Sequence, residues 1–383
     1  MRDGFRIFDI DRHVYEPLSL WPDYLERRFA AHAPALAYLD RGEALSDRMS
    51  AGGPGVLLPL PPDLIVDGEP VMNVSRGAKI QIATAAVARP DALAEGETAA
   101  GQLAAMDRDG IDAALLLPTY ASYLVAMDHR EPGLAAGFAA AYNRWMAEMC
   151  AADPARLRAA ALIARFDPAG MIEQAAFAVA RGWPAVTLRP NPIAGRLLGD
   201  PENAAFWAYC ADNGLAVIVH EGAHARAASA GADRFTSRFA LHACSHPMEQ
   251  MMAYLSLLES GVMESHPDLR FAFLEAGCGW MVNWLWRLDE VEYANLADEV
   301  SATIRRRPSD YFRRQCAIGF EPDEPMLAET LEYLGPDRVM FGSDFPHLDH
   351  AADIVGSAMA LPIGRERLAK VLWGNATNLL GIT

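Results

Sequence analysis

The chain has 383 residues, of which 52% are hydrophobic and 22% are charged, a composition typical of a globular protein with ample material for a core. Its 33 basic and 50 acidic residues give a formal net charge of −17, which excludes nucleic acid and anionic membrane as expected partners, because both need a basic footprint. The chain shows no apolar secretory segment and nothing approaching the roughly 18 apolar residues of a membrane span, so we expect a cytoplasmic protein.

Eight short apolar runs alternate with longer stretches of helical periodicity. The runs cover residues 6–10, 113–117, 159–163, 185–188, 215–219, 270–274, 315–319 and 337–341. Helical periodicity is clearest over residues 133–152, 168–181 and 201–213. Such alternation predicts a parallel sheet with helical crossovers, and eight units predict closure into a (β/α)8 barrel of the TIM type. We therefore expect a single α/β domain over residues 1–383.

One segment, residues 31–97, breaks this alternation. It is rich in Gly, Pro and Ala, most visibly at residues 51–55 and 58–62. A long irregular segment within a compact domain is usually a functional lid or a tolerated insertion. Because it leaves the carboxyl end of the first strand, we interpret it as a lid over the active-site mouth. Arg48 and Arg76 could supply an anion clamp from this lid, although exposure to solvent is the better explanation for each.

Residues able to bind a metal ion or move a proton follow four of the predicted strands. Asp11 and His13 follow the first strand, His220 the fifth, Glu275 the sixth and Asp344 the eighth. The carboxyl ends of barrel strands meet on one face, where active sites are built. Asp11 and His13 lie two residues apart, so in extended backbone they point the same way and could grip one cation.

His220 and Asp344 would add a nitrogen and an oxygen to that pair from other parts of the barrel. One divalent metal ion is therefore predicted. Such a mixed donor set suits Zn²⁺ best and tolerates Mn²⁺ or Fe²⁺. The alternative is that Asp11 and His13 merely cap and pack the end of a strand.

Other polar residues allow two readings. Arg189 follows the fourth strand and could pair with a substrate carboxylate, or it could form a structural salt bridge. His347 lies three residues after Asp344, either beside the metal and substrate or behind the ligands. One of His224, His242 and His246 could face the pocket, and the sequence does not select among them.

Six motifs, spread in order along the chain, carry a resemblance to a known family. They are residues 8–17, 106–112, 219–222, 273–280, 341–347 and 374–381. Together they are similar to the amidohydrolase-related family, the branch of the amidohydrolase superfamily that contains aminocarboxymuconate-semialdehyde decarboxylase and γ-resorcylate decarboxylase. Only the segment 31–97 stays unmatched.

The resemblance implies a distorted (β/α)8 barrel with one divalent metal ion held by Asp11, His13, His220 and Asp344. Two positions depart from the decarboxylases of the family. Asp11 stands where they commonly carry His or Glu, and Glu275 stands where they carry a catalytic His at the end of the sixth strand. A glutamate keeps acid/base chemistry available only if its pKa is tuned or if it acts on metal-bound water.

The resemblance implies non-oxidative decarboxylation of an aromatic or unsaturated carboxylic acid, with Glu275 and Asp344 as catalytic residues and Arg189 and His347 contacting the substrate. The alternative is metal-dependent hydrolysis of an amide or lactone, or hydration of a double bond, for which Glu275 is well suited. A barrel that binds a ligand without turnover is a further alternative, and the complete set of metal-binding residue types argues against it.

Members of this family often form dimers, so the resemblance also implies a homodimer. Trp280, Trp284 and Trp286 follow Glu275 with helical spacing, which favours packing in the core or at a subunit interface over stacking on a substrate. A small molecule is the expected substrate.

Overall fold

The computed structural model describes residues 1–39, 49–51, 57–72, 74–127, 131, 133–221, 227–347 and 353–382. Eight strands form one sheet in chain order, and each neighbouring pair is parallel. The strands are β1 (Phe8–Val14), β7 (Ala113–Pro118), β8 (Leu157–Leu162), β9 (Ala185–Leu188), β10 (Ala216–His220), β11 (Phe271–Leu274), β12 (Cys316–Phe320) and β13 (Val339–Phe341). The predicted (β/α)8 barrel is confirmed, with strand boundaries within a few residues of those expected.

The sheet closes through the backbone of Asp11. The amide groups of Ser343 and Asp344 donate to the Asp11 carbonyl at 3.2 and 2.8 Å, and so join the chain after β13 to β1. The first strand is longer than predicted because it continues to Val14, with every residue buried. Asp11 and His13 therefore lie within this strand, near an irregularity in the register between Asp9 and Arg12.

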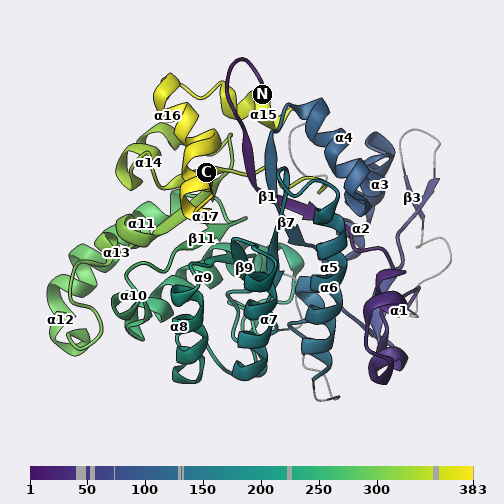
Figure 1. Ribbon diagram of the computed structural model, residues 1–383, viewed down its shortest axis with the longest axis horizontal. Coiled ribbons are helices and arrows are strands. Elements are labelled where there is room, and N and C mark those ends of the chain that lie inside the picture. The colour runs from purple at the N-terminus through teal and green to yellow at the C-terminus, as the bar shows by residue number, and fades with distance from the viewer. Residues whose placement is uncertain are drawn as a thin grey trace.

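Helices surround the barrel (Figure 1). The longer ones are α4 (Ala99–Asp109), α6 (Leu134–Ala151), α7 (Pro168–Ala180), α8 (Ala204–Asp212), α9 (Arg238–Glu259), α11 (Gly279–Arg287), α13 (Pro308–Gln315) and α14 (Leu327–Leu334). Shorter helices are α1 (Leu20–Tyr24), α5 (Tyr120–Leu124), α10 (Val262–Ser265), α12 (Ala294–Val300), α15 (Ile354–Met359), α16 (Arg365–Ala369) and α17 (Asn375–Leu380). Single 3₁₀ turns cover Arg27–His32 and Pro201–Asn203, and π-helical turns cover Leu288–Tyr293 and Lys370–Gly374.

All three helical stretches predicted from periodicity are present as α6, α7 and α8. Their limits follow local chemistry. Helix α7 begins at Pro168, directly after Asp167, whose carboxylate accepts from the amides of Ala169 and Gly170 at 3.2 and 3.1 Å. None of the helices in the described ranges is both long and apolar enough to cross a bilayer.

Two apolar layers hold the barrel. Alternate strand residues point inward, and they are six alanines and seven larger side chains: Phe8, Ile10, Ala113, Leu115, Leu117, Ala160, Ala185, Ala216, Ile218, Ala272, Leu274, Ala317 and Met340. The small side chains leave room for larger ones on neighbouring strands, so the interior is packed rather than open. Helix α17 joins this cluster through Ala376, Leu379 and Leu380.

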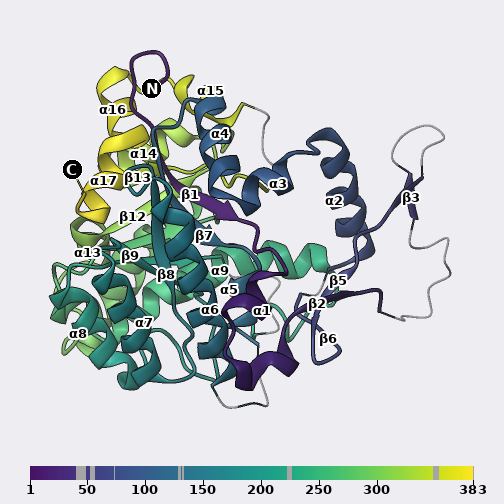
Figure 2. The ribbon, with the colours of Figure 1, turned by 45° about the vertical axis from the view of Figure 1, so that its right-hand side comes forward.

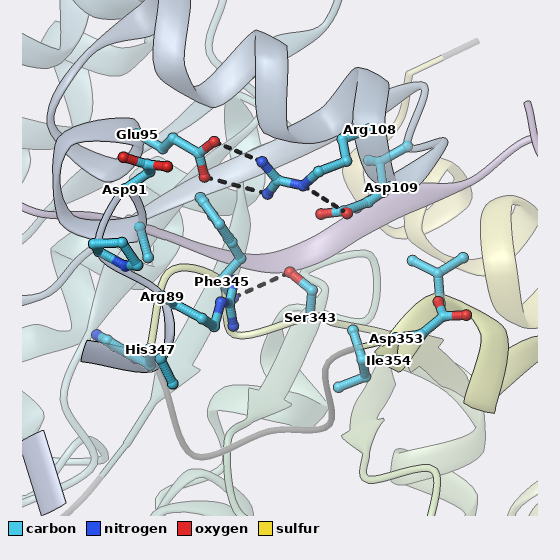
Figure 3. Close-up of a pocket in the computed structure, with 15 residues that line it drawn as sticks. Arg89, Asp91, Glu95, Arg108, Asp109, Ser343, Phe345, His347, Asp353 and Ile354 are labelled. Carbon is cyan, nitrogen blue, oxygen red and sulfur yellow. Dashed lines mark hydrogen bonds and ion pairs between the residues drawn. The ribbon is translucent and has the colours of Figure 1, made fainter. Parts of the chain in front are cut away.

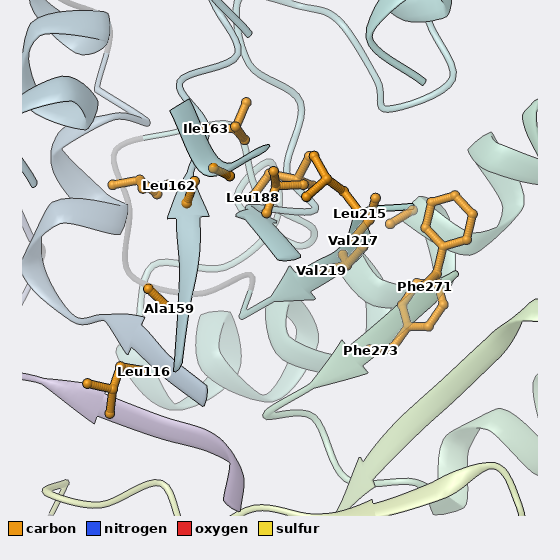
Figure 4. Close-up of a cluster of buried hydrophobic side chains, with 14 of the residues drawn as sticks. Leu116, Ala159, Leu162, Ile163, Leu188, Leu215, Val217, Val219, Phe271 and Phe273 are labelled. Atoms are coloured by element: carbon orange, nitrogen blue, oxygen red, sulfur yellow. The ribbon is translucent and has the colours of Figure 1, made fainter. Parts of the chain in front are cut away.

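The other strand residues point outward and pack against the helices. Figure 4 shows this layer with Leu116 on β7, Leu162 on β8, Val217 and Val219 on β10, and Phe273 on β11. Large aromatic rings fill the space between strands and helices. One example is Tyr254 of α9, whose ring meets Phe273 edge-on with centroids 5.8 Å apart.

The segment 31–97 has more regular structure than its composition predicted. It contains a small antiparallel sheet of β2 (Ala35–Ala37), β5 (Asp63–Val66) and β6 (Glu69–Pro70), and a separate pair of β3 (Met49–Ala51) with β4 (Leu57–Pro59). Helices α2 (Arg76–Ala88) and α3 (Ala92–Glu97) follow. The alanine-rich run after Ser75 explains α2, because alanine favours helix and Ser75 caps it. Figure 2 shows β3 and α2 standing off the side of the barrel.

Candidate metal centre

Five ionisable side chains meet at the carboxyl end of the barrel strands. Asp11 and His13 come from β1, His220 ends β10, Glu275 follows β11 directly, and Asp344 follows β13 by three residues. Asp11, His13, His220 and Asp344 are almost completely buried, whereas the Glu275 side chain keeps 22% of its surface exposed. The strand ends therefore bring together the residues that the sequence singled out.

The two imidazoles form the middle of this cluster. His13 Nε2 lies 3.0 Å from His220 Nε2, 3.4 Å from Asp11 Oδ1 and 3.3 Å from Asp344 Oδ1. His220 Nε2 lies 3.2 Å from Asp11 Oδ1 and 2.9 Å from Glu275 Oε2. Nitrogen and oxygen donors this close together are the arrangement that a divalent metal ion requires, and the residues present fit such an ion.

A backbone carbonyl on the neighbouring strand fixes the orientation of the His13 imidazole. Its Nδ1 lies 2.9 Å from the Pro118 carbonyl, which can only accept, so Nδ1 carries the proton. Nε2 is then directed into the cluster, where it would offer its lone pair to a bound metal ion. This backbone contact is the support that metal-binding histidines in proteins usually have.

Attraction between opposite charges holds the side chains of the cluster together. Burial alone would disfavour the charged carboxylate of Asp11, but His220 and the hydrogen bond from His13 lower its pKa to about 2. Burial likewise opposes protonation of His220, but Asp11 and Glu275 raise its pKa to about 9. The pKa of Glu275 is held well below its ordinary value by the same two histidines, against the effect of burial.

A buried polar network supports β1, and the sequence analysis missed it. Asp9 accepts from the Ser343 amide and hydroxyl at 2.8 and 2.5 Å and pairs with Arg12 at 3.2 Å. Arg12 Nε donates to Gln102 Oε1 at 2.6 Å, and Gln102 Nε2 donates to the His13 carbonyl at 2.7 Å. Burial raises the pKa of Asp9 to about 6, against Arg12 and Ser343. The available signal was the unusual density of charge in the run from Asp9 to His13.

Glu16 is a second buried carboxylate that the sequence analysis missed. It accepts hydrogen bonds from the amides of Thr119, Tyr120 and Ala121 at 3.1, 2.9 and 3.0 Å. These amides belong to Thr119, directly after β7, and to the first two residues of α5, so Glu16 fixes the start of α5. Burial raises the pKa of Glu16 despite these bonds.

Three residues at the site have left-handed backbone without being glycine. Glu221, Glu275 and Asp344 have φ values of 46°, 56° and 51°. For a residue with a Cβ atom this conformation costs roughly 1–2 kcal/mol, and such strain collects at functional sites. Two of the three are the predicted catalytic residues.

Arg189 lies in a buried ion pair. Its Nη1 is 2.7 Å from Glu221 Oε2, and both side chains are 3% exposed. His246 continues this group, since its Nε2 lies 3.4 Å from Glu221 Oε1 and its Nδ1 lies 2.9 Å from the Glu275 carbonyl. His242 stacks on His246 with ring centroids 4.3 Å apart. His246 is thus the one nearest the cluster of the two described candidates, and His224 lies outside the described residues.

His347 connects Asp344 to the loop after β7. Its Nδ1 lies 2.7 Å from Asp344 Oδ1, and its Nε2 lies 3.0 Å from Thr119 Oγ1. A cavity of about 330 Å³ reaches His347 from the side (Figure 3), where Arg108 bridges Glu95 and Asp109 on one wall. The cavity approaches the cluster through His347, Ser343 and Phe345.

The remaining predicted residues have structural surroundings. Arg76 Nη2 donates to the Met49 carbonyl at 3.1 Å, within the segment 31–97, and Arg48 lies outside the described residues. Trp280 and Trp284 pack against the core and donate to the carbonyls of Gly277 and Met251 at 2.9 and 3.2 Å. Core packing is thus confirmed for two of the three tryptophans.

A family model and several solved structures match nearly the whole chain. A family model described as Amidohydrolase matches residues 10–382. An amidohydrolase from Mycobacterium avium subsp. paratuberculosis has a TM-score of 0.73 at 22% identity, covering 99% of both chains. A 5-carboxyvanillate decarboxylase from Sphingomonas paucimobilis has a TM-score of 0.70 at 23% identity, covering 99% of this chain and 100% of that one.

A third solved structure holds ligands. It is a dihydroxybenzoic acid decarboxylase from Polaromonas sp. with bound manganese and the inhibitor 2-nitroresorcinol, with a TM-score of 0.67 at 16% identity, covering 98% of this chain and 97% of that one. No curated protein matches the chain. At these identities the solved structures establish the barrel fold.

Proposed function

This chain belongs to the amidohydrolase family, and from that premise we propose that it is a metal-dependent decarboxylase of an aromatic or unsaturated carboxylic acid. The observation that carries the proposal is the cluster of His13, His220, Asp11, Glu275 and Asp344 at the carboxyl end of the barrel. The similar structures named as decarboxylases of carboxyvanillate and dihydroxybenzoic acid support the substrate class.

Asp11, His13 and His220, with one of the two nearby carboxylates, would hold the metal ion. When bound there, a divalent ion acts as a Lewis acid that stabilises negative charge developing on the substrate. The donor set suits Zn²⁺, and the manganese in the Polaromonas structure supports Mn²⁺. We propose one divalent ion per chain, either Zn²⁺ or Mn²⁺.

The reaction needs one proton donor. The bond between the ring or alkene carbon and the carboxylate breaks, its electron pair stays on the carbon, CO2 leaves, and a proton joins that carbon. Two carboxyl groups are candidate donors: Glu275 Oε2 and Asp344 Oδ1 lie 3.5 and 3.3 Å from His13 Nε2. His347, 2.7 Å from Asp344, is in place to exchange a proton with it.

Substrate contacts come from residues around this cluster. We propose that His347 contacts the substrate from the side of the cavity, and that the segment 31–97 covers the mouth as a lid. Arg189 stays a predicted substrate-binding residue, and its buried pair with Glu221 favours the structural alternative.

Hydrolysis is the second candidate, and Glu275 favours it. A carboxylate 2.9 Å from His220, with part of its surface exposed, is placed to take a proton from a water molecule. Under this reading an amide or a lactone is hydrolysed, or the same activated water adds across a double bond.

We further propose that the enzyme works as a cytoplasmic homodimer. All five cysteines are free, as is usual where thiols stay reduced. Exposed apolar side chains on α9 and α11, namely Met248, Met252 and Trp286, support an interface there. Light scattering of the purified protein tests the oligomeric state.

Metal content and CO2 release test the proposed function together. Elemental analysis of purified wild type should find about one Zn²⁺ or Mn²⁺ per chain, with a sharp reduction in Asp11→Asn. The metal-loaded wild type should then release CO2 from a hydroxybenzoic acid in a panel that also contains amides and lactones. Turnover of the amides or lactones alone would favour hydrolysis, and a protein that binds no divalent ion would exclude both reactions.

A further inference from the structure

Glu275 is one of two carboxylates that could complete the set of metal ligands around His13 and His220. Among the described residues, one set of metal-ligand atoms that lie within 4.8 Å of one another comprises Asp11, His13, His220 and Glu275. Asp344 belongs to a second set, with His13, Glu275 and His347. The carboxylate that completes the group around both buried imidazoles and Asp11 is therefore Glu275.

The distances in the first set match those between ligands of one ion. If each bond to the metal is about 2.1 Å, adjacent donors lie about 3.0 Å apart in an octahedron and about 3.4 Å apart in a tetrahedron. Glu275 Oε2 lies 2.9 Å from His220 Nε2 and 3.5 Å from His13 Nε2. Asp11 Oδ1 lies 3.2 and 3.4 Å from the same two nitrogens. Glu275 thus stands in the same relation to the histidines as Asp11 does.

The backbone around Glu275 is held on both sides. His246 Nδ1 contacts the Glu275 carbonyl at 2.9 Å, and Gln250 Nε2 donates to the Leu274 carbonyl at 3.0 Å. On the following side, Glu324 accepts from the amides of Cys278 and Gly279 at 2.9 and 2.8 Å. The left-handed φ of 56° at Glu275 is kept by these contacts and turns the chain directly after β11. Such fixed placement is what a ligand position needs.

Asp344 has different neighbours. Its Oδ1 is 2.7 Å from His347 Nδ1, and His347 in turn reaches Thr119 Oγ1 at 3.0 Å. The same Asp344 oxygen also lies 3.3 Å from His13 Nε2, so Asp344 joins the cluster beside that imidazole. Glu275 Oε2 lies within 3.5 Å of the Nε2 atoms of both His13 and His220.

We propose that Glu275 is an inner ligand of the metal ion. This inference concerns metal binding alone and stands without the proposed decarboxylation.

The test compares Glu275→Gln with Glu249→Gln as a matched control. Glu249 is a buried glutamate outside the cluster whose Oε1 accepts from the Ala230 amide at 2.5 Å, a bond that glutamine can also accept. Metal-free wild type and variants are titrated with Mn²⁺, and free Mn²⁺ is read by electron paramagnetic resonance. We expect Glu275→Gln to raise the dissociation constant at least ~10-fold, and Glu249→Gln to leave it within about 2-fold of wild type.

A second readout counts water on the ion. At saturating Mn²⁺, water-proton relaxivity should rise in Glu275→Gln, because water takes the position that the carboxylate leaves, and it should stay unchanged in the control. If Glu275→Gln does not fold, Glu275→Asp replaces it, since this variant keeps the charge but retracts the carboxylate, and a raised dissociation constant is again expected.

An affinity and a relaxivity equal to wild type in Glu275→Gln overturn the ligand assignment. Both measurements are made without substrate, so they separate this inference from the proposed function. Loss of CO2 release at unchanged Mn²⁺ affinity would retain decarboxylation and make Glu275 the proton donor. Loss of Mn²⁺ affinity in a protein that decarboxylates nothing would retain the ligand and reject the reaction.

Discussion

The barrel mouth and the segment 31–97 lie next to each other in the chain but are built in opposite ways. At the mouth, His13, His220 and Asp11 are at most 5% exposed, and each contacts polar groups from other strands. In the segment, Leu57 is 67% exposed on β4, which pairs with β3, and Leu36 is 52% exposed on β2, which pairs with β5. The contrast teaches that the barrel holds the residues of the candidate metal centre in buried polar contacts, whereas the segment 31–97 exposes apolar side chains on short strands.

The strongest way to break this contrast is to remove a histidine from the mouth. His220→Ala should abolish metal retention and lower turnover at least ~1000-fold, because it removes a nitrogen donor that also contacts Asp11 and Glu275. Elemental analysis after dialysis measures the metal content. Retention of one ion per chain by this variant would show that the centre lies elsewhere.

A second way is to remove the hydrogen bonds of Gln102 that hold β1, without changing any residue of the cluster. Gln102→Leu leaves Arg12 Nε and the His13 carbonyl without their partner in a buried place. We expect a loss of about 2–4 kcal/mol in the free energy of unfolding, because buried polar groups are costly to leave unpaired. Urea unfolding of the metal-free protein measures it. A loss below about 1 kcal/mol would mean that water replaces the amide.

A third test probes how tightly β13 approaches β1. A Cβ atom on Gly342 would lie 2.4 Å from the Asp11 Cβ, so Gly342→Ala should destabilise by about 1–3 kcal/mol and displace Asp11. Gly374→Ala is the control, since its Cβ meets no atom within 4 Å and its φ of −61° suits alanine. Thermal unfolding compares the two. Equal melting temperatures would contradict the close approach.

The charge of the unloaded cluster predicts a pH dependence. The pKa of His220 rises from 6.5 to about 9 on folding, opposed by burial and driven by Asp11 and Glu275. Its stabilisation is therefore complete below pH 6.5 and lost as the pH rises through about 9. We expect metal-free protein to lose at least about 1 kcal/mol over this range. Metal-loaded protein, in which the imidazole is already deprotonated, should change less when both are melted side by side.

The smallest effect is expected in the segment 31–97. Leu57→Ser replaces an exposed leucine in β4, so stability should change by less than about 0.5 kcal/mol. Metal content should equal that of wild type. A large loss of stability in urea would show instead that this side chain is covered, for example by a second copy of the chain.

The sequence predicted the barrel well because its signal is local. Each strand reads as a short apolar run, and parallel strands force residues such as His220 and Asp344 onto one face. The support behind the cluster was beyond prediction, since the contact of Gln102 with Arg12 joins residues 90 positions apart with no pattern between them. The segment 31–97 was misjudged as irregular because Gly and Pro masked the alanine-rich helix α2.

The left-handed backbone at Glu221, Glu275 and Asp344 has a consequence for how variants of this protein would be selected. At these positions the residue that the backbone prefers is glycine, while the residue that the proposed metal centre uses carries a carboxylate. Glycine would relieve up to about 1 kcal/mol of backbone strain per position, but at Glu221 it would leave Arg189 unpaired in a buried place. A library screened only for heat resistance would therefore accept glycine only where the relief of strain exceeds the loss of the ion pair.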